Sequence, residues 1–332
     1  MKRTLFAALT GVVVLAGCAK TEVTEVSDNR AISFSNFVTN SVKSIDEKTD
    51  LNKFYVYGGF DGTWNLFDGE EVTYNGTNWE YTPVRYWVPN NEYYYAAYSN
   101  NNGNGNVSDV TFNETTHELT FNYSNNSAAT DDLIYATSGL QQWNGTGDVP
   151  EVPFNFKHIL SKVAFQFSKA ADLNGVELSI TNISFKNYRD GIFIGQTITG
   201  NQYPIDCWSV TNTLGSLNFT EPIVLLGDGE TQNTAYYVVI PQKLTEDNVV
   251  EFNVTFSIPN EDGVVDNESE NTKTIPCTVK INGTEGNNWK PGHVYLYSAV
   301  IDAENLDLDP IVFNVTDVAK WETEPTIPVE IQ

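Results

Sequence analysis

The chain has 332 residues, 40% of them hydrophobic, and it carries 18 lysine and arginine residues against 43 aspartate and glutamate residues, a formal charge of −25. So acidic a surface cannot neutralise phosphates, which argues against nucleic acid as a partner, and the length favours two domains. After the N-terminus no segment approaches the roughly 18 apolar residues of a membrane-spanning helix, so the body of the protein is expected to be soluble.

The first 18 residues have the order of a bacterial export signal. Lys2 and Arg3 precede a charge-free apolar run over residues 5–17, which ends in the sequence LAGC at 15–18. The run is too short to cross a bilayer, and its basic, apolar and small-residue order is typical of a cleaved signal. The pattern predicts a lipoprotein signal peptide over residues 1–18, with Cys18 as the lipid-bearing first residue of the processed chain.

Residues 19–30 form a polar tether or propeptide that ends at Arg30. Beyond it, Ile32, Ser33 and Phe34 alternate like the start of a β-strand. A trypsin-like protease would cut an exposed chain between Arg30 and Ala31. Two interpretations stay open: a maturation site that frees the first strand, or a solvated arginine in an ordinary flexible tether.

The body of the chain alternates short aromatic and β-branched runs with Asn, Gly, Asp and Pro, which predicts an all-β protein. Apolar strands are expected at 53–60 and 92–98, with a hairpin between them that turns at Asn75-Gly76. The Gly- and Pro-rich stretch 141–153 is the best domain boundary.

Beyond that stretch a second set of strands is predicted. Val163, Phe165 and Phe167 alternate with Ala164 and Gln166, so one side of this strand should face a second core. The later strands are expected at 175–185, 191–198, 223–226, 235–240, 249–258, 274–281, 293–301 and 310–315. Two β-sandwiches follow as the natural architecture, an N-terminal domain over 31–150 and a C-terminal domain over 151–332.

Four blocks of sequence carry a resemblance to a known family. They are LAGC with the nearby Arg30, PVRYW at 83–87 followed by YYYAAY at 93–98, FKHILSKV at 156–163, and WKPGHVYLY at 289–297. In this order and spacing the chain resembles the fimbrillin family, the lipoprotein-derived type V pilins of Bacteroidetes.

The resemblance implies two tandem transthyretin-like β-sandwich domains, exported to the cell outer membrane as a lipoprotein and located in a cell-surface fimbrium. It also implies an arginine-specific surface protease that cuts after an arginine. A strand from a neighbouring pilin subunit, in a self-polymer or from an anchor or tip protein, would then fill the vacated groove.

The candidate donor strand is the C-terminal segment 326–332. Ile327, Val329 and Ile331 alternate there, as in a strand that buries one face. Pro328 lacks an N–H and is awkward in a strand bonded on both sides. An ordinary terminal strand of the chain's own domain is the competing interpretation.

Residues for catalysis or metal binding are not found in a recognisable pattern. The three histidines, His117, His158 and His293, stand apart, and no Cys/His spacing suggests zinc. The acidic stretches 227–230 and 261–263 lack EF-hand spacing and are better explained as solvated turns. Cys207 and Cys277 are either a disulfide or two unpaired thiols. We therefore expect no enzyme activity, no cofactor and no metal.

The rival interpretation is a glycan-binding outer-membrane surface lipoprotein. The chain carries 7 Trp and 17 Tyr, and exposed aromatic faces are what sugar rings stack on. A platform of Trp64, Trp79, Trp87 and Trp143 would serve this role, although aromatic residues in sandwiches are usually core. The favoured function is a structural pilin subunit that supports adhesion or biofilm growth.

Overall fold

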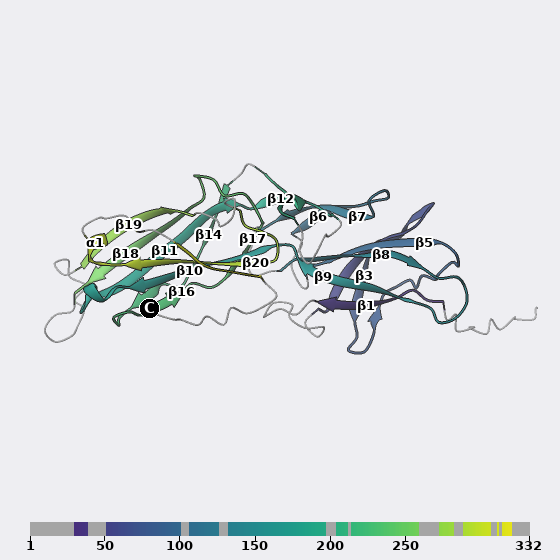
Figure 1. Cartoon of the computed structure of the whole chain (residues 1–332), viewed down its shortest axis with the longest axis horizontal. Helices are drawn as coiled ribbons and strands as arrows, with labels where there is room; N and C mark the ends of the chain where they lie inside the picture. The colour runs from purple at the N-terminus through teal and green to yellow at the C-terminus, as the bar shows by residue number, and fades with distance from the viewer. Residues whose placement is uncertain are drawn as a thin grey trace, which may run out of the picture.

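A computed structural model gives the arrangement of the chain, which is elongated and built almost wholly from β-strands (Figure 1). The structure describes residues 30–38, 51–100, 106–125, 132–196, 204–211, 214–258, 272–281, 288–306, 311 and 314–320. Cys18, Ile327, Val329 and Ile331 lie outside these residues. The all-β prediction is confirmed, since the described helices are only the short η1 (Ala171–Leu173), η2 (Ile205–Cys207) and α1 (Ala303–Leu306).

The N-terminal part is organised around a seven-stranded sheet. Its strands, in spatial order, are β1 (Ser33–Val38), β9 (Glu151–His158), β8 (Ile134–Gln142), β5 (Glu92–Ser99), β2 (Lys53–Phe60), β3 (Thr63–Tyr74) and β4 (Trp79–Glu80). The predicted Asn-Gly hairpin is confirmed, because Tyr74 pairs with Trp79 and Gly76 has a φ of 96°. The Asn75 side chain accepts hydrogen bonds from two N–H groups of this turn.

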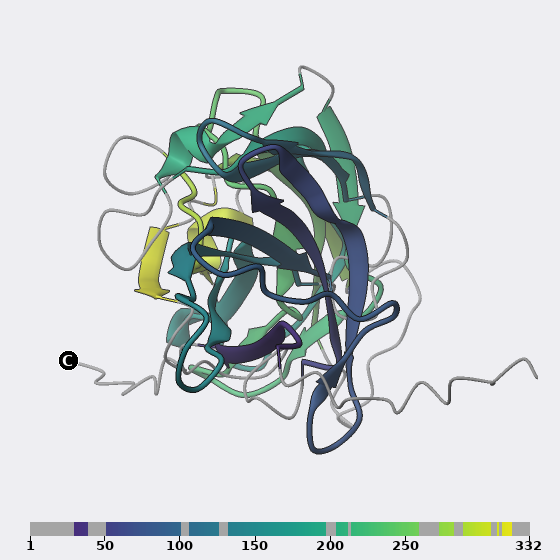
Figure 2. The ribbon, with the colours of Figure 1, turned by 90° about the vertical axis from the view of Figure 1, so that its right-hand side faces the viewer.

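This sheet curls around its own core, which gathers inward-facing side chains from β1, β2, β3, β5, β8 and β9. The two end strands of the sheet, β1 and β4, come close to each other. Viewed from its N-terminal end, the molecule shows the curved strands of this sheet, with the purple β1 in the lower half of the view (Figure 2). The first strand therefore helps to close one side of the core.

The C-terminal part is a sandwich of two sheets. One sheet contains β16 (Thr231–Asn233), β10 (Ser161–Lys169), β20 (His293–Ile301) and β21 (Asn314–Lys320), with β17 (Tyr237–Val239) also on β10. The other contains β14 (Leu214–Asn218), β11 (Glu177–Tyr188), β18 (Val249–Ser257) and β19 (Thr272–Lys280), with β15 (Ile223–Leu225) on β11. As the alternation predicted, Val163, Phe165 and Phe167 face the core between them.

A four-stranded sheet joins the two parts (Figure 1). Its strands are β13 (Trp208–Val210), β12 (Asp190–Ile194), β7 (Glu118–Ser124) and β6 (Val107–Asn113). It covers a third core, the junction core, which mixes side chains such as Tyr98 and Phe121 with Val238 and Val294. The indole N–H of Trp208 donates to the Ile159 carbonyl across 2.7 Å inside this core.

Strand pairing runs across the position of the expected domain boundary. β8 and β9 lie on either side of residue 150 and pair within the same sheet. β7 pairs with β12, which comes much later in the chain. The division at residues 150 and 151 therefore follows the sequence rather than the sheets, and the two-domain description stays a prediction.

Candidate functional site

The structure describes the expected cleavage point, and it lies where the first strand enters the fold. Arg30 is exposed, and its carbonyl accepts a hydrogen bond from the Trp87 N–H at 2.9 Å. Ala31 forms an isolated antiparallel bridge with Tyr86. The peptide bond between Arg30 and Ala31 is thus at the surface and held against the segment that contains Trp87.

Tyr81 and Arg85 hold the next residue by its backbone. The Ile32 N–H donates to the Arg85 carbonyl at 2.9 Å, and the Tyr81 hydroxyl donates to the Ile32 carbonyl at 2.7 Å. The same hydroxyl accepts from the Arg85 N–H at 3.3 Å. Burial raises the pKa of Tyr81 to about 12 against the opposing effect of Arg85, so the hydroxyl keeps its proton and can donate.

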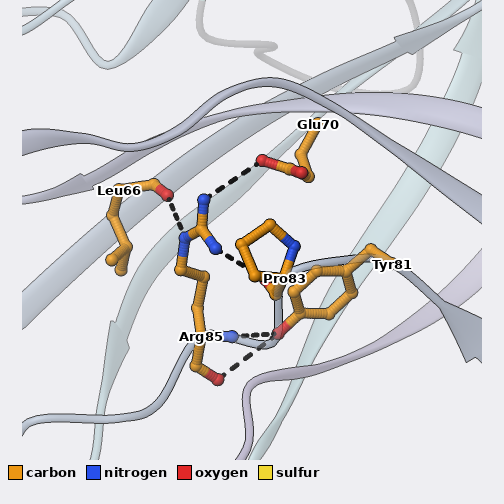
Figure 3. Close-up of polar contacts among 5 residues, drawn as sticks. All are labelled: Leu66, Glu70, Tyr81, Pro83 and Arg85. Atoms are coloured by element: carbon orange, nitrogen blue, oxygen red, sulfur yellow. Dashed lines mark hydrogen bonds and ion pairs between the residues drawn. The ribbon is translucent and has the colours of Figure 1, made fainter.

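The Arg85 side chain fixes this segment onto β3 (Figure 3). Its Nε donates to the Leu66 carbonyl at 3.0 Å, and its Nη1 donates to the Pro83 carbonyl at 2.6 Å. Its Nη2 lies 3.3 Å from a Glu70 carboxylate oxygen. We call Tyr81, Arg85 and Trp87 the Arg85 clamp, because their hydrogen bonds hold residues 30–32 in place.

Two side chains anchor the strand that follows. Ile32 is 2% exposed and Phe34 is 4% exposed. The Phe34 ring stacks on Phe154 at 5.7 Å and meets Phe67 edge-on at 5.4 Å. Burial of two such side chains contributes about 3 to 6 kcal/mol, so β1 stays attached through groups that follow Arg30.

β1 is also an edge strand. It pairs in parallel with β9 and stands last in the strand order, so no second described strand pairs with its other side. An edge of this kind presents unpaired backbone groups to a further strand. Beside it, Val84, Tyr86 and Val88 alternate outward from the clamp segment, with 48%, 44% and 48% of each residue exposed.

Sequence reasoning identified the 83–87 block as a family signature but gave Arg85 and Tyr81 no role. The role depends on backbone carbonyls of residues far away in the chain, which no local pattern shows. The available signal was compositional: Arg85 is one of only four arginines in an acidic chain.

The other predicted residues are distributed over the fold. Cys207 and Cys277 are free thiols, the first buried in the junction core and the second half-buried. In the 227–230 turn, Glu230 accepts hydrogen bonds from the backbone N–H groups of Leu226 and Gly227, as in the predicted solvated turn. The stretch 261–263 lies outside the described residues.

The three histidines do not meet. His117 stacks on Tyr94, His158 lies 2.7 Å from a carboxylate oxygen of buried Asp132, and His293 Nδ1 lies 2.9 Å from the Pro291 carbonyl. Among the described residues, no group of three or more His, Cys, Asp or Glu side chains is arranged to hold a metal ion.

The four tryptophans proposed as a sugar platform do not form one. Trp87 is 1% exposed and Trp143 is 9% exposed, and both belong to the N-terminal core. Trp79 packs against the same core. That expectation was wrong because three of the four rings pack in or against the N-terminal core, those of Trp87 and Trp143 from segments outside the strands. The fourth, Trp64, joins a separate, partly exposed group of rings.

The fimbrillin-like family profile matches residues 32–321, which is most of the chain. The chain belongs to the fimbrillin-like family. The predicted resemblance is therefore confirmed. A search of curated proteins finds no match.

A comparison with solved structures finds similar chains at low sequence identity. A fimbrial protein from Bacteroides vulgatus matches with a TM-score of 0.59 at 15% identity, over 88% of this chain and 100% of that one. The fimbrial anchor protein Mfa2 from Porphyromonas gingivalis is 12% identical over 88% of this chain and 98% of that one, with a TM-score of 0.42. In the described part of the chain, no helix has the length and apolar character to span a membrane.

Proposed function

We propose that this chain is a structural pilin subunit that is exported as a lipoprotein, cut after Arg30, and polymerised by strand exchange into surface fimbriae for adhesion or biofilm growth. The lipid on Cys18 would hold it at the outer membrane until an arginine-specific surface protease acts. The observation that carries the proposal is the exposed Arg30–Ala31 bond at the entrance of a clamped edge strand. Family membership supports the same role.

The described contacts next to the bond lie on both of its sides. Ile32 and Phe34, on the downstream side, are buried, and the carbonyl of Arg30 accepts a hydrogen bond from the clamp. Hydrolysis consumes one water, and it leaves a carboxylate on Arg30 and a new amino group on Ala31. In place of the release of the first strand that the sequence suggested, the downstream strand β1 would stay attached while the upstream peptide departs.

Departure of residues 19–30 would leave the Trp87 N–H without the Arg30 carbonyl. The edge of β1 and the outward Val84, Tyr86 and Val88 lie beside that position. An incoming strand satisfies unpaired backbone groups and covers apolar side chains in one step. The segment 326–332 of another copy is the proposed occupant.

The energy of such an exchange is adequate for a polymer. Burying Ile327, Val329 and Ile331 would contribute about 5 to 9 kcal/mol before the entropy of association is subtracted. Each ladder hydrogen bond adds about 1 kcal/mol. Because the acidic surface repels other copies, a specific strand contact is needed to hold subunits together.

Trypsin treatment followed by N-terminal sequencing and electron microscopy tests the proposal. The wild-type chain should yield a new terminus at Ala31 and then fibres. The Arg30→Gln chain should stay uncut there and monomeric, and a matched Lys20→Gln change, which removes the other basic residue of the tether, should not prevent fibres. A cut chain that stays monomeric, or fibres formed equally by the Arg30→Gln chain, would refute the maturation mechanism.

A shortened chain tests the proposed donor strand separately. A chain that ends at residue 325 should still be cut at Arg30 but should form no fibres. Adding a synthetic peptide of residues 326–332 to the cut, shortened chain should give a one-to-one complex rather than a polymer. Fibres from the shortened chain would assign the donor to another segment.

A further inference from the structure

Four aromatic rings gather at one end of the seven-stranded sheet, on the opposite side of the sheet from the N-terminal core. They belong to Trp64 of β3, Tyr94 of β5, Phe112 of β6 and His117 of the turn between β6 and β7. All four side chains are partly exposed. Tyr94 alternates with Tyr93 and Tyr95, which face the core, so its ring lies on the other face of β5.

The rings are in close contact. Tyr94 and His117 stack with centroids 3.7 Å apart and planes 10° apart. Trp64 lies 5.1 Å from His117 and 6.1 Å from Phe112. A Cβ on Gly58 would come within 3.2 Å of Phe112, so this ring packs directly onto the backbone of β2. We call these four residues the aromatic cluster.

The turn presents His117 in a strained conformation. Its φ of 61° is in the left-handed region, which is unfavourable for a residue other than glycine. The His117 N–H donates to the Asn113 carbonyl at 2.7 Å, and the Asn113 side chain accepts from the N–H groups of Thr115 and Thr116. Strain of this kind, fixed by the surrounding turn, is often found at binding sites.

A hollow of about 160 Å³ opens beside the stacked pair. Tyr94 and His117 line it together with Thr116, Glu118 and Thr137. Ring walls with a few hydroxyl, imidazole and carboxylate groups are the composition of a small-ligand site. Burial lowers the pKa of His117 against the opposing charge of Glu118, so near pH 7 its ring is neutral and offers one donor and one acceptor.

The geometry points to a carbohydrate site: we propose that the aromatic cluster and its hollow bind a neutral sugar residue of a surface glycan. A pyranose ring has an apolar face to lay on an aromatic ring and hydroxyl groups to reach Thr116, Thr137 and Glu118. The formal charge of −25 disfavours sialylated or sulfated sugars as well as nucleotides. Sugar binding is independent of fibre assembly, because the Arg85 clamp uses β1 and the 81–87 segment instead.

A second stacked pair in the C-terminal part provides a control. Phe219 and Tyr237 stack at 4.2 Å beside a hollow of about 120 Å³. Here Phe219 is 8% exposed and packs in the sandwich core, and the Tyr237 hydroxyl donates to the Asn218 carbonyl. This pair is explained by packing alone, so its loss should leave sugar binding unchanged.

The test uses the uncut chain on an array of neutral and sialylated oligosaccharides, followed by titration with the neutral sugar that binds. His117→Asn should weaken binding at least tenfold, because asparagine tolerates the left-handed turn but removes the stacked ring. Trp64 packs against His117 without lining the hollow, so Trp64→Leu should weaken binding by a smaller factor than His117→Asn. Tyr237→Ala should change it less than twofold. In a second measurement, the His117 ring proton signals in the NMR spectrum should shift during titration of the wild-type chain.

Three results would overturn the proposal. The first is no binding of any neutral sugar on the array, and the second is binding confined to sialylated sugars. The third is neutral-sugar binding that survives His117→Asn without moving the His117 signals. None of them depends on cleavage at Arg30, so the outcome is separate from the test of fibre formation.

Discussion

The two ends of the molecule enclose their cores in different ways. The C-terminal core lies between two sheets, and its central strands β10 and β11 each have paired neighbours on both sides. The N-terminal core is wrapped by one curled sheet, and β1, with one paired neighbour, closes it. The N-terminal core is thus closed by an edge strand, at the end of the molecule where the expected cut lies.

The two ends also differ in the contacts that hold their strands in place. Interior strands of the sandwich are secured by ladders and packing along their whole length. The entry of β1 is secured instead by the Arg85 clamp and by Ile32 and Phe34. β1 also pairs with β9 along its whole length, so the contacts at its entry are the ones that single substitutions can remove.

The largest expected effect comes from Phe34→Ala, which removes the main anchor of β1. Loss of a buried phenylalanine costs about 3 to 5 kcal/mol in the free energy of unfolding. The matched change Phe167→Ala, at a 0% exposed position of the C-terminal core, should cost a similar amount. Urea unfolding measures both.

Hydrogen exchange separates the two variants. Only Phe34→Ala should increase exchange at the Ile32 amide, because that amide is held by the edge that Phe34 anchors. Equal exchange at Ile32 in the two variants would mean that the two ends do not differ as described.

The next effect concerns Asp132 and His158, a buried pair beside β8 and β9 with side chains 2% and 4% exposed. A hydrogen bond to a buried charged group contributes up to about 3 kcal/mol, the loss expected for Asp132→Asn at pH 7. Burial alone raises the pKa of Asp132, but the attraction and hydrogen bond of His158 outweigh it and lower that pKa below 3.8.

The lowered pKa of Asp132 makes the folded state less stable in acid. A lowered carboxyl pKa stabilises the fold fully above the unfolded value of 3.8, and this stabilisation is lost as the pH falls towards the folded value. The wild-type chain should lose stability more steeply below about pH 4 than Asp132→Asn. Thermal unfolding between pH 7 and pH 3 measures this, and parallel curves for the two chains would contradict it.

A smaller effect is expected from Trp208→Phe in the junction core. The change leaves the buried Ile159 carbonyl without the indole donor at 2.7 Å, which costs about 1 to 3 kcal/mol. Trp289→Phe is the control, since it removes a 2.8 Å hydrogen bond to the Tyr297 hydroxyl within the C-terminal core alone. Calorimetry should show the two ends unfolding less cooperatively in Trp208→Phe than in the control.

The sequence predicted where the strands lie far better than it predicted which strands pair with one another. Alternation identified Val163, Phe165 and Phe167 as core, and Asn75-Gly76 as a hairpin turn, because each depends on residues close together in the chain. The parallel pairing of β1 with β9 joins strands more than a hundred residues apart, so no local period indicates it.

The candidate site was likewise predicted only in part. The sequence indicated an arginine, Arg30, followed by an alternating strand that begins near Ile32. It did not indicate the hydrogen bonds of Tyr81 and Arg85, because these connect side chains to distant backbone carbonyls. The aromatic cluster was missed for a related reason: its rings come from separate strands that only the folded sheets bring together.

The smallest effect we expect is that of Tyr81→Phe, which removes the hydroxyl that donates to the Ile32 carbonyl and accepts from the Arg85 N–H. The Ile32 carbonyl loses its 2.7 Å donor, at a cost of about 0.5 to 1.5 kcal/mol. Tyr55→Phe is the control, because its hydroxyl bonds the exposed Glu71 carboxylate and should cost almost nothing. If the clamp holds the edge as described, trypsin should cut after Arg30 faster in Tyr81→Phe than in the control, since a looser segment enters a protease more readily. Equal cutting rates would show that Phe34 and Ile32 hold this edge without help from the clamp.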